Sequence, residues 1–255
     1  MGLFHLARRK LATFAATVRA CDNWPQITLA KLNLGGANTE LKFRNGLRLQ
    51  PVPPLRATWG EIFEPAIADL YGIRASKPDL IVDVGANMGA FSCFAAHAHP
   101  GALVHAFEPS PAHADMLEAN VAVNRLPNVI LHRDAVTKDG RDVVFSTIGA
   151  GGSSGIFLQG DGPSTHLKSV SLDCIDFSNA RSLFIKLDCE GAEGEIIGWI
   201  CTNLGRLPPQ ITLACEYHHW CPIPLDQALD MLRAHGFQAE RRTLFDEPYV
   251  FAGRG

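Results

Sequence analysis

The sequence lacks several features that would assign a protein to a class at once. Its formal net charge is −3, so it has no basic excess for binding nucleic acid. No apolar run approaches the roughly 18 residues of a membrane-spanning helix. The seven cysteines are scattered and form no C-x-x-C pair, which argues against a disulfide framework or a structural zinc site. We therefore expect a cytoplasmic protein that has no nucleic-acid partner and no transmembrane segment.

What is present predicts a main domain with an N-terminal appendage. The chain has 255 residues, of which 47% are hydrophobic, enough for a large core. Residues 1–75 are expected to form the appendage, and 76–255 the main domain. The first twenty residues predict an amphipathic helix without a secretory signal, packed on the main domain or at a homo-oligomer contact. Weak peripheral membrane contact is the alternative. Asn45-Gly46 predicts a β-hairpin, and 59–71 a helix.

From residue 79 the pattern alternates between strands and helices, which predicts a mostly parallel sheet with helices on both faces. A terminal antiparallel hairpin completes this α/β, Rossmann-like fold of seven strands. A glycine-rich loop at 149–155 could close over a substrate. The predicted strands are 80–84, 103–107, 129–132, 183–187, 211–215, 237–242 and 249–252, with an extra strand at 143–147; the helices are 89–99, 111–124, a segment ending at 200, and 225–234.

Acidic or histidine side chains follow each of the first five predicted strands. Because ligands of open α/β sheets bind outside the carboxyl ends of the strands, these side chains are expected around one site. A single carboxylate there would be an ordinary solvated residue, but five strand ends share the pattern. The residues are Asp83, Glu108, Asp134, Asp188 with Glu190, and Glu216 with His218 and His219.

The turn after the first of these strands is glycine-rich but departs from a dinucleotide fingerprint. Gly85 and Gly89 permit a sharp turn and a close approach to a ligand, yet Asn87 occupies the second glycine position of G-x-G-x-x-G. Glu108 lies near the roughly 20-residue offset expected of an acid that binds ribose hydroxyls. Its alternative role is to cap the following helix. Together these residues favour S-adenosylmethionine over a dinucleotide.

Four segments resemble the FkbM family of S-adenosylmethionine-dependent methyltransferases. The run Lys186-Leu187-Asp188-Cys189-Glu190-Gly191-Ala192-Glu193 is the most distinctive, because generic Rossmann proteins lack it. The other three are 82–89, 107–111 and 171–173, and the resemblance extends from about residue 44 to 216. It implies a class I methyltransferase fold and methyl transfer, usually to a hydroxyl of a saccharide or natural product.

The resemblance also implies roles for individual residues. Asp83, Gly85 and Asn87 would line the methionine end of S-adenosylmethionine, with Ala86 and Gly89 in the same turn. Glu108 would bind the ribose, and Asp134, in a looser match, the adenine amino group.

Methyl transfer to a hydroxyl gains from a base, because a hydroxyl is a poor nucleophile. Asp188 is the first choice for base or acceptor anchor, with Lys186 on the same face of the strand and Glu190 beside it. His218 or His219 is an alternative base, or the two form an ordinary loop pair. A divalent metal such as Mg²⁺ could bind the acids here, but the motif does not require one, so no metal ligand is predicted.

Trp59, Tyr217 and Trp220 are candidate walls for a small-molecule or saccharide acceptor. Two functions of other classes stay open. One is a nicotinamide-dependent reductase on a similar sheet, and the other is a non-catalytic interaction module with a methyltransferase fold.

Overall fold

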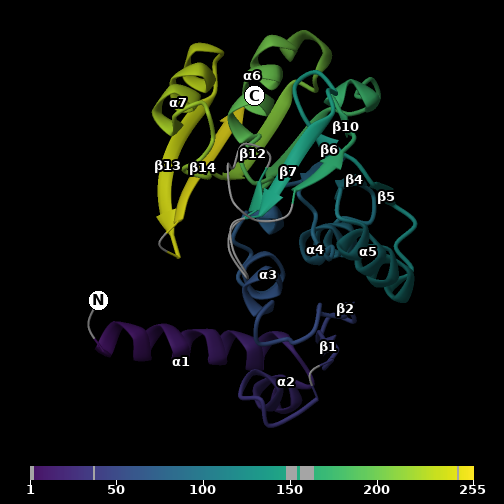
Figure 1. Ribbon diagram of the computed structural model, residues 1–255, viewed down its shortest axis with the longest axis vertical. Helices are drawn as coiled ribbons and strands as arrows, with labels where there is room; N and C mark the ends of the chain where they lie inside the picture. Colours follow the sequence, from purple (N-terminus) through teal and green to yellow (C-terminus); the bar gives the residue numbers. More distant parts are fainter. Residues whose placement is uncertain (1–2, 37, 148–153, 156–163, 246) are drawn as a thin grey trace.

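A seven-stranded sheet forms the centre of the computed structural model, which describes residues 3–36, 38–147, 154–155, 164–245 and 247–255. The strand order is β13-β14-β12-β11-β3-β4-β5 (Figure 1). All neighbouring strands are parallel except for the pairs that β14 makes with β12 and β13. The predicted mostly parallel sheet with a terminal antiparallel hairpin is therefore confirmed. The strands are β3 (Leu80–Val84), β4 (Leu103–Phe107), β5 (Val129–His132), β11 (Ser182–Leu187), β12 (Gln210–Glu216), β13 (Gln238–Leu244) and β14 (Glu247–Arg254).

Helices cover both faces of this sheet, because alternate residues of its strands point to opposite sides. Leu80, Val82 and Val84 of β3 join one hydrophobic cluster, to which α6 and α7 contribute. Ile81 joins a second cluster on the opposite face with residues of α4 and of the N-terminal segment. The helices are α4 (Ala90–Ala98), α5 (Pro111–Asn124), α6 (Glu193–Thr202) and α7 (Leu225–Ala234).

The N-terminal segment packs on the α4 side of the sheet and shares its core. Ile27, Leu41 and Leu55 are fully buried in the same cluster as Ile81 and Phe91. The predicted hairpin is present as β1 paired with β2, and the division at residue 75 stays a prediction. The elements are α1 (Leu3–Ala20), α2 (Trp24–Lys31), β1 (Leu41–Lys42), β2 (Arg48–Leu49), α3 (Trp59–Ile62), the π-helix η1 (Phe63–Ile67) and the 3₁₀-helix η2 (Ile73–Ala75).

Two N-terminal features differ from the prediction. Helix α2 follows α1 after three residues, and no helix was predicted there. The predicted helix over 59–71 is instead one α-turn, α3, followed by η1, in which the Ala68 N–H donates to the Phe63 carbonyl at 2.8 Å. Pro65 has no N–H, so it cannot continue the ordinary helical ladder and the hydrogen-bond spacing widens.

Short elements connect β5 to β11 and β11 to β12. They are β6 (Ala135–Val136), β7 (Val143–Thr147), β8 (Ser154–Gly155), β9 (Ser164–Leu167), β10 (Ser169–Val170) and the 3₁₀-helices η3 (Leu172–Cys174) and η4 (Leu204–Arg206). Of the predicted loop 149–155, residues 149–153 lie outside the described part. None of the helices described is long and apolar enough to cross a membrane. All seven cysteines are free, and five of them are buried.

Candidate active site

A cavity of about 210 Å³ opens at the carboxyl ends of β3, β11 and β12. Strand β3 has β4 on one side and β11 on the other, so the chain reverses its direction of travel across the sheet here. That is the topological switch point at which open α/β sheets bind ligands. Carboxylates dominate the lining, which consists of Gly60, Glu61, Glu64, Pro65, Tyr71, Gly85, Ala86, Asn87, Ala90, Phe91, Lys186, Asp188, Glu190, Glu216 and His218.

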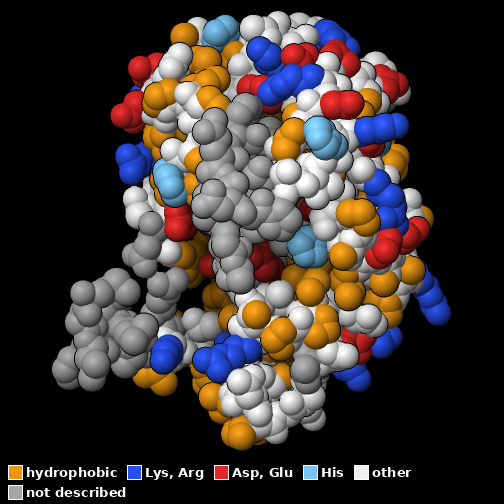
Figure 2. Space-filling model, viewed as in Figure 1, with side chains coloured by type: hydrophobic (Ala, Val, Ile, Leu, Met, Phe, Trp, Pro, Cys, Tyr) orange, Lys and Arg blue, Asp and Glu red, His pale blue; other side chains and the backbone are white. Residues whose placement is uncertain are grey.

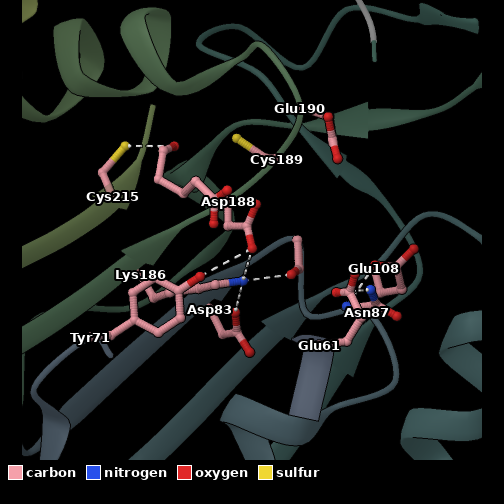
Figure 3. A network of polar contacts seen from close by, with 12 residues as sticks. Glu61, Tyr71, Asp83, Asn87, Glu108, Lys186, Asp188, Cys189, Glu190 and Cys215 are labelled. Atoms are coloured by element: carbon pink, nitrogen blue, oxygen red, sulfur yellow. Dashed lines mark hydrogen bonds and ion pairs between the residues drawn. The ribbon is translucent and has the colours of Figure 1, made fainter. Parts of the chain in front are cut away.

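Lys186 lies at the bottom of this cavity and pairs with Asp83 beneath it. The two residues are register partners on adjacent strands, and their ionised groups lie 3.1 Å apart (Figure 3). The Lys186 ammonium also donates to the Gly85 carbonyl at 2.7 Å and lies 3.5 Å from Asp188. We call Asp83, Lys186 and the Gly85 carbonyl the pocket floor. Burial lowers the pKa of Lys186, but the charges of Asp83 and Asp188 outweigh it and hold the pKa above its ordinary value.

Asp83 itself does not face the cavity. Its side chain is fully buried, and its second oxygen accepts a hydrogen bond from the Ser92 hydroxyl at 2.5 Å. A buried carboxylate is retained only when it is paired, and here Lys186 and Ser92 supply the partners. Asp83 therefore holds the lysine in place and would act on a ligand only through it.

Gly85 is required by the protein's own backbone. Its φ is +77°, and a Cβ there would lie 1.8 Å from the Asp188 carbonyl oxygen. Gly89, at φ +82°, would similarly place a Cβ 2.7 Å from a side-chain carbon of Leu117. Neither position tolerates a side chain. The two glycines thus bring β3, β11 and α5 together, whether or not a ligand also approaches them.

Glu108 ties the turn after β3 to the turn after β4. Its two oxygens accept from the backbone N–H groups of Asn87 and Ser110, both at 2.8 Å, and the side chain is nearly buried. The Asn87 side chain in turn donates to Glu61 at 2.9 Å (Figure 3). Burial raises the pKa of Glu108, and the two backbone hydrogen bonds oppose this. Each oxygen of an ionised carboxylate keeps a further lone pair that could accept from a hydroxyl.

His218 lies on the opposite side of the cavity and is held by a buried carboxylate. Its Nδ1 lies 2.8 Å from Glu193, whose side chain is fully buried and also accepts from the backbone N–H groups of Cys189 and Gly191. Nε2 faces Glu190 at 3.5 Å and Asp188 at 3.9 Å. Burial lowers the pKa of His218, but Glu193 and the two other carboxylates outweigh it and raise it to about 9. The imidazole is therefore a cation at neutral pH.

Two carboxylates beside His218 have pKa values near neutrality. Burial raises the pKa of Glu190 and of Glu216 to about 7; the charge of His218 opposes this rise, and repulsion by nearby carboxylates adds to it. Glu216 accepts a hydrogen bond from the Tyr249 hydroxyl at 2.7 Å, whereas Glu190 lies at φ +60° with an oxygen that has no hydrogen-bond donor. We call Glu190, Glu216 and His218 the pocket rim.

The structure places eight of the predicted site residues on the cavity wall. They are Gly85, Ala86, Asn87, Lys186, Asp188, Glu190, Glu216 and His218. Asp83 lies beneath the wall, and Gly89, Glu108 and Asp134 lie outside the lining. Of the candidate aromatic walls, Tyr217 donates to the Ile223 carbonyl at 2.6 Å, and Trp59 and Trp220 pack on neighbouring rings.

Sequence reasoning missed the wall residues that have a titratable side chain and come from the N-terminal segment, Glu61, Glu64 and Tyr71. They come from α3, η1 and the segment after it. The Tyr71 hydroxyl donates to Asp188 at 3.1 Å, so the N-terminal segment contributes directly to the site. Only the proline within a predicted helix signalled an irregularity there.

Asp188, Glu216 and His218 each offer one ligand atom within 4.8 Å of the others. Each of the three already has a cation or a hydrogen-bond partner, however. Lys186 and Tyr71 contact Asp188, Tyr249 donates to Glu216, and a protonated His218 cannot bind a metal. We assign no metal to these residues.

Comparison with known proteins assigns the chain to a family. The family model described as the methyltransferase FkbM domain matches residues 83–239, more than half of the chain. The chain belongs to the FkbM methyltransferase family. This confirms the family predicted from the sequence and, with the seven-stranded sheet, the class I methyltransferase fold. It also removes the reductase alternative.

Curated relatives share shorter segments. The 31-O-demethyl-FK506 methyltransferase FkbM of Streptomyces tacrolimicus is 42% identical over 66 residues, which are 26% of this chain and 25% of the relative. Methyltransferase sdnD of Sordaria araneosa is 42% identical over 64 residues, 25% of this chain and 24% of the relative. The matched segment thus spans about a quarter of each relative.

Solved structures are more distant. Precorrin-6y C5,15-methyltransferase of Geobacter metallireducens GS-15 is 17% identical with a TM-score of 0.45, over 73% of this chain and 85% of that one. M. jannaschii TYW2 in complex with AdoMet is 13% identical with a TM-score of 0.45, over 86% of this chain and 85% of that one.

Proposed function

We propose that this FkbM-family protein is an S-adenosylmethionine-dependent methyltransferase that O-methylates a hydroxyl of a saccharide or natural-product scaffold. The observation that carries the proposal is the cavity at the switch point, whose wall has carboxylates from the ends of β11 and β12 and one buried ammonium paired with Asp83 of β3. One curated relative is named for methyl transfer to 31-O-demethyl-FK506, which supports a hydroxyl acceptor.

The acidic lining fits a cationic methyl donor. S-adenosylmethionine supplies an electrophilic methyl group on a positively charged sulfonium. Five carboxylates line the cavity, against Lys186 and His218 as cations. Glu108 retains lone pairs for the two ribose hydroxyls, and Asn87 would face the methionine end. Asp134 would contact the adenine from the loop after β5.

On the acceptor side, the structure favours a carboxylate over the histidine as base. His218 is held protonated by Glu193, so it would need to lose a proton before accepting one. Asp188 is fixed by Lys186 and Tyr71 and would anchor the acceptor hydroxyl. Glu190 carries an oxygen with no hydrogen-bond donor and a pKa near the working pH, which suits a general base. We assign Glu190 that role.

Turnover and cofactor binding test this function separately. The purified chain should convert S-adenosylmethionine to S-adenosylhomocysteine when a panel of polyhydroxylated natural products and saccharides is supplied. In calorimetry, Glu108→Ala should weaken S-adenosylmethionine binding at least about tenfold, because two charge-assisted hydrogen bonds are lost. Glu118→Ala, an exposed acid on α5 paired with Arg133, is the matched control and should bind normally.

Two outcomes would contradict the proposal. Equal affinity of Glu108→Ala and the unaltered chain, with both folded by circular dichroism, would reject the cofactor site. Cofactor binding without turnover on any acceptor of the panel would support the non-catalytic interaction module instead.

We also propose a cytoplasmic location. The support is chemical: all seven cysteines are free thiols, as a reducing compartment maintains them.

A further inference from the structure

Exposed apolar side chains gather in the first two helices and in the turn that follows α2. Eight large hydrophobic residues are exposed among the side chains that the structure describes, and five of them lie between residues 11 and 34. Leu11, Leu32 and Leu34 are the most open, at 69%, 61% and 71%. The complete set in this segment is Leu11, Phe14, Leu29, Leu32 and Leu34, which we call the apolar ridge. The other three are scattered over β4, β5 and β7. An apolar concentration of this kind marks an interaction surface.

The same segment is basic in an acidic protein. Residues 1–34 contain five lysines and arginines and a single aspartate, whereas the whole chain has a net charge of −3. Lys10 and Arg19 are exposed on α1. Figure 2 shows blue and orange side chains together at the lower end of the molecule, where α1 and α2 lie in Figure 1. Two exposed cations thus lie on the helix that carries Leu11 and Phe14.

Helix α1 is attached to the body mainly through its C-terminal end. Thr17 is buried, Arg44 donates to the Val18 carbonyl, and Cys21 pairs with Phe43. The rest of the helix extends away from the sheet (Figure 1). Leu11, Phe14 and Val18 recur at helical spacing and share one face, of which Leu11 and Phe14 are exposed. That face therefore does not serve to bury core.

We propose that the α1–α2 segment is a docking surface for an anionic lipid bilayer. A helix with apolar side chains on one face and lysine and arginine beside them lies in the membrane interface, with its apolar side chains among the acyl chains and its cations at the headgroups. A second copy of this chain fits less well, because a two-fold contact would oppose the same basic residues. The surface would hold a soluble catalytic domain at a membrane that contains its acceptor.

Vesicle flotation with the full chain tests the proposal independently of methyl transfer. The chain should float with vesicles of phosphatidylcholine and phosphatidylglycerol, and much less with phosphatidylcholine alone or in high salt. Leu11→Ser combined with Leu32→Ser should lower the partition coefficient about 100-fold, because two inserted side chains are lost. Leu103→Ser combined with Ile130→Ser is the matched control, since these residues are 39% and 40% exposed elsewhere, and it should float normally.

The charge contribution has its own pair of variants. Lys10→Gln should weaken vesicle binding about fivefold, the effect of one lysine near an anionic surface, and Lys138→Gln should leave it unchanged. Absence of flotation with anionic vesicles would overturn the proposal. Equal losses in the ridge variant and its control would do so too. Concentration-dependent dimers that the ridge variant abolishes, without vesicle binding, would assign the surface to a second copy.

Discussion

The pocket floor and the pocket rim are both clusters of opposite charges, yet they differ in how completely those charges are paired. On the floor, Lys186 is nearly buried and contacts Asp83, Asp188 and the Gly85 carbonyl. On the rim, Glu190 and Glu216 stand beside one histidine, and their pKa values rise to about 7 because the groups are buried and, to a lesser extent, because other carboxylates lie nearby.

Because of this difference, we expect the pocket floor to position the strands and the pocket rim to carry out acid–base chemistry. A fully paired buried charge resists titration and fixes geometry, so the floor locks β3 against β11. Groups that titrate near neutrality can exchange protons during a reaction, so the rim suits acid–base work. Changes on the floor should therefore act on stability, and changes on the rim on rate and pH dependence.

The largest effect is expected from Lys186→Met. The substitution keeps most of the side-chain volume but leaves the Asp83 carboxylate buried without its cation. Breaking a buried pair in this way costs about 3–5 kcal/mol in the free energy of unfolding. Urea denaturation followed by circular dichroism measures it.

The double variant Lys186→Met with Asp83→Asn provides the control. It removes the orphaned charge, so it should recover a substantial part of the lost stability. If the double variant loses as much free energy of unfolding as the two single variants together, Lys186 and Asp83 are not coupled and the pocket floor is not a single unit.

On the rim, Glu190→Gln should lower kcat about 100-fold or more, because a positioned general base is lost. In the unaltered chain kcat should rise with pH through about 7, as Glu190 loses its proton. Glu190→Gln should abolish this rise while the affinity for S-adenosylmethionine stays within about threefold. Steady-state kinetics from pH 5.5 to 8.5 would show both effects.

Glu216→Gln is the matched control, since Glu216 has a similar pKa but is held by the Tyr249 hydroxyl. It should retain the rise in kcat through pH 7. Should Glu216→Gln flatten the profile while Glu190→Gln preserves it, the base would be Glu216.

The strands of the sheet could be predicted because they are apolar runs bounded by turns, and the acids that end them identified the correct edge. The contributions of Glu61, Glu64 and Tyr71 to the cavity wall could not be predicted, because they depend on how a distant segment folds over α4. Helix α2 was missed because its apolar residues lack a clear one-faced pattern. The sequence pattern explained Gly85 by a sharp turn and a nearby ligand, and only the structure shows that the Asp188 carbonyl also requires a glycine there. Sequence patterns report local propensity well and contacts between distant segments poorly.

The smallest expected effect is a loss of stability at mildly alkaline pH that traces to His218. An ordinary histidine has a pKa of about 6.5, and Glu193 raises the folded-state value to about 9. The folded protein therefore binds a proton more tightly than the unfolded chain. The stabilisation is complete below about pH 6.5 and is lost as the pH rises through 9. We expect the free energy of unfolding to fall by about 2 kcal/mol between pH 6.5 and 9.

In His218→Gln this pH dependence of the free energy of unfolding should largely disappear, whereas His219→Gln, one residue away, should keep it. Thermal melts across this range decide the matter, and an unchanged slope in His218→Gln would mean that Glu193 and His218 are not ion-paired in the folded protein.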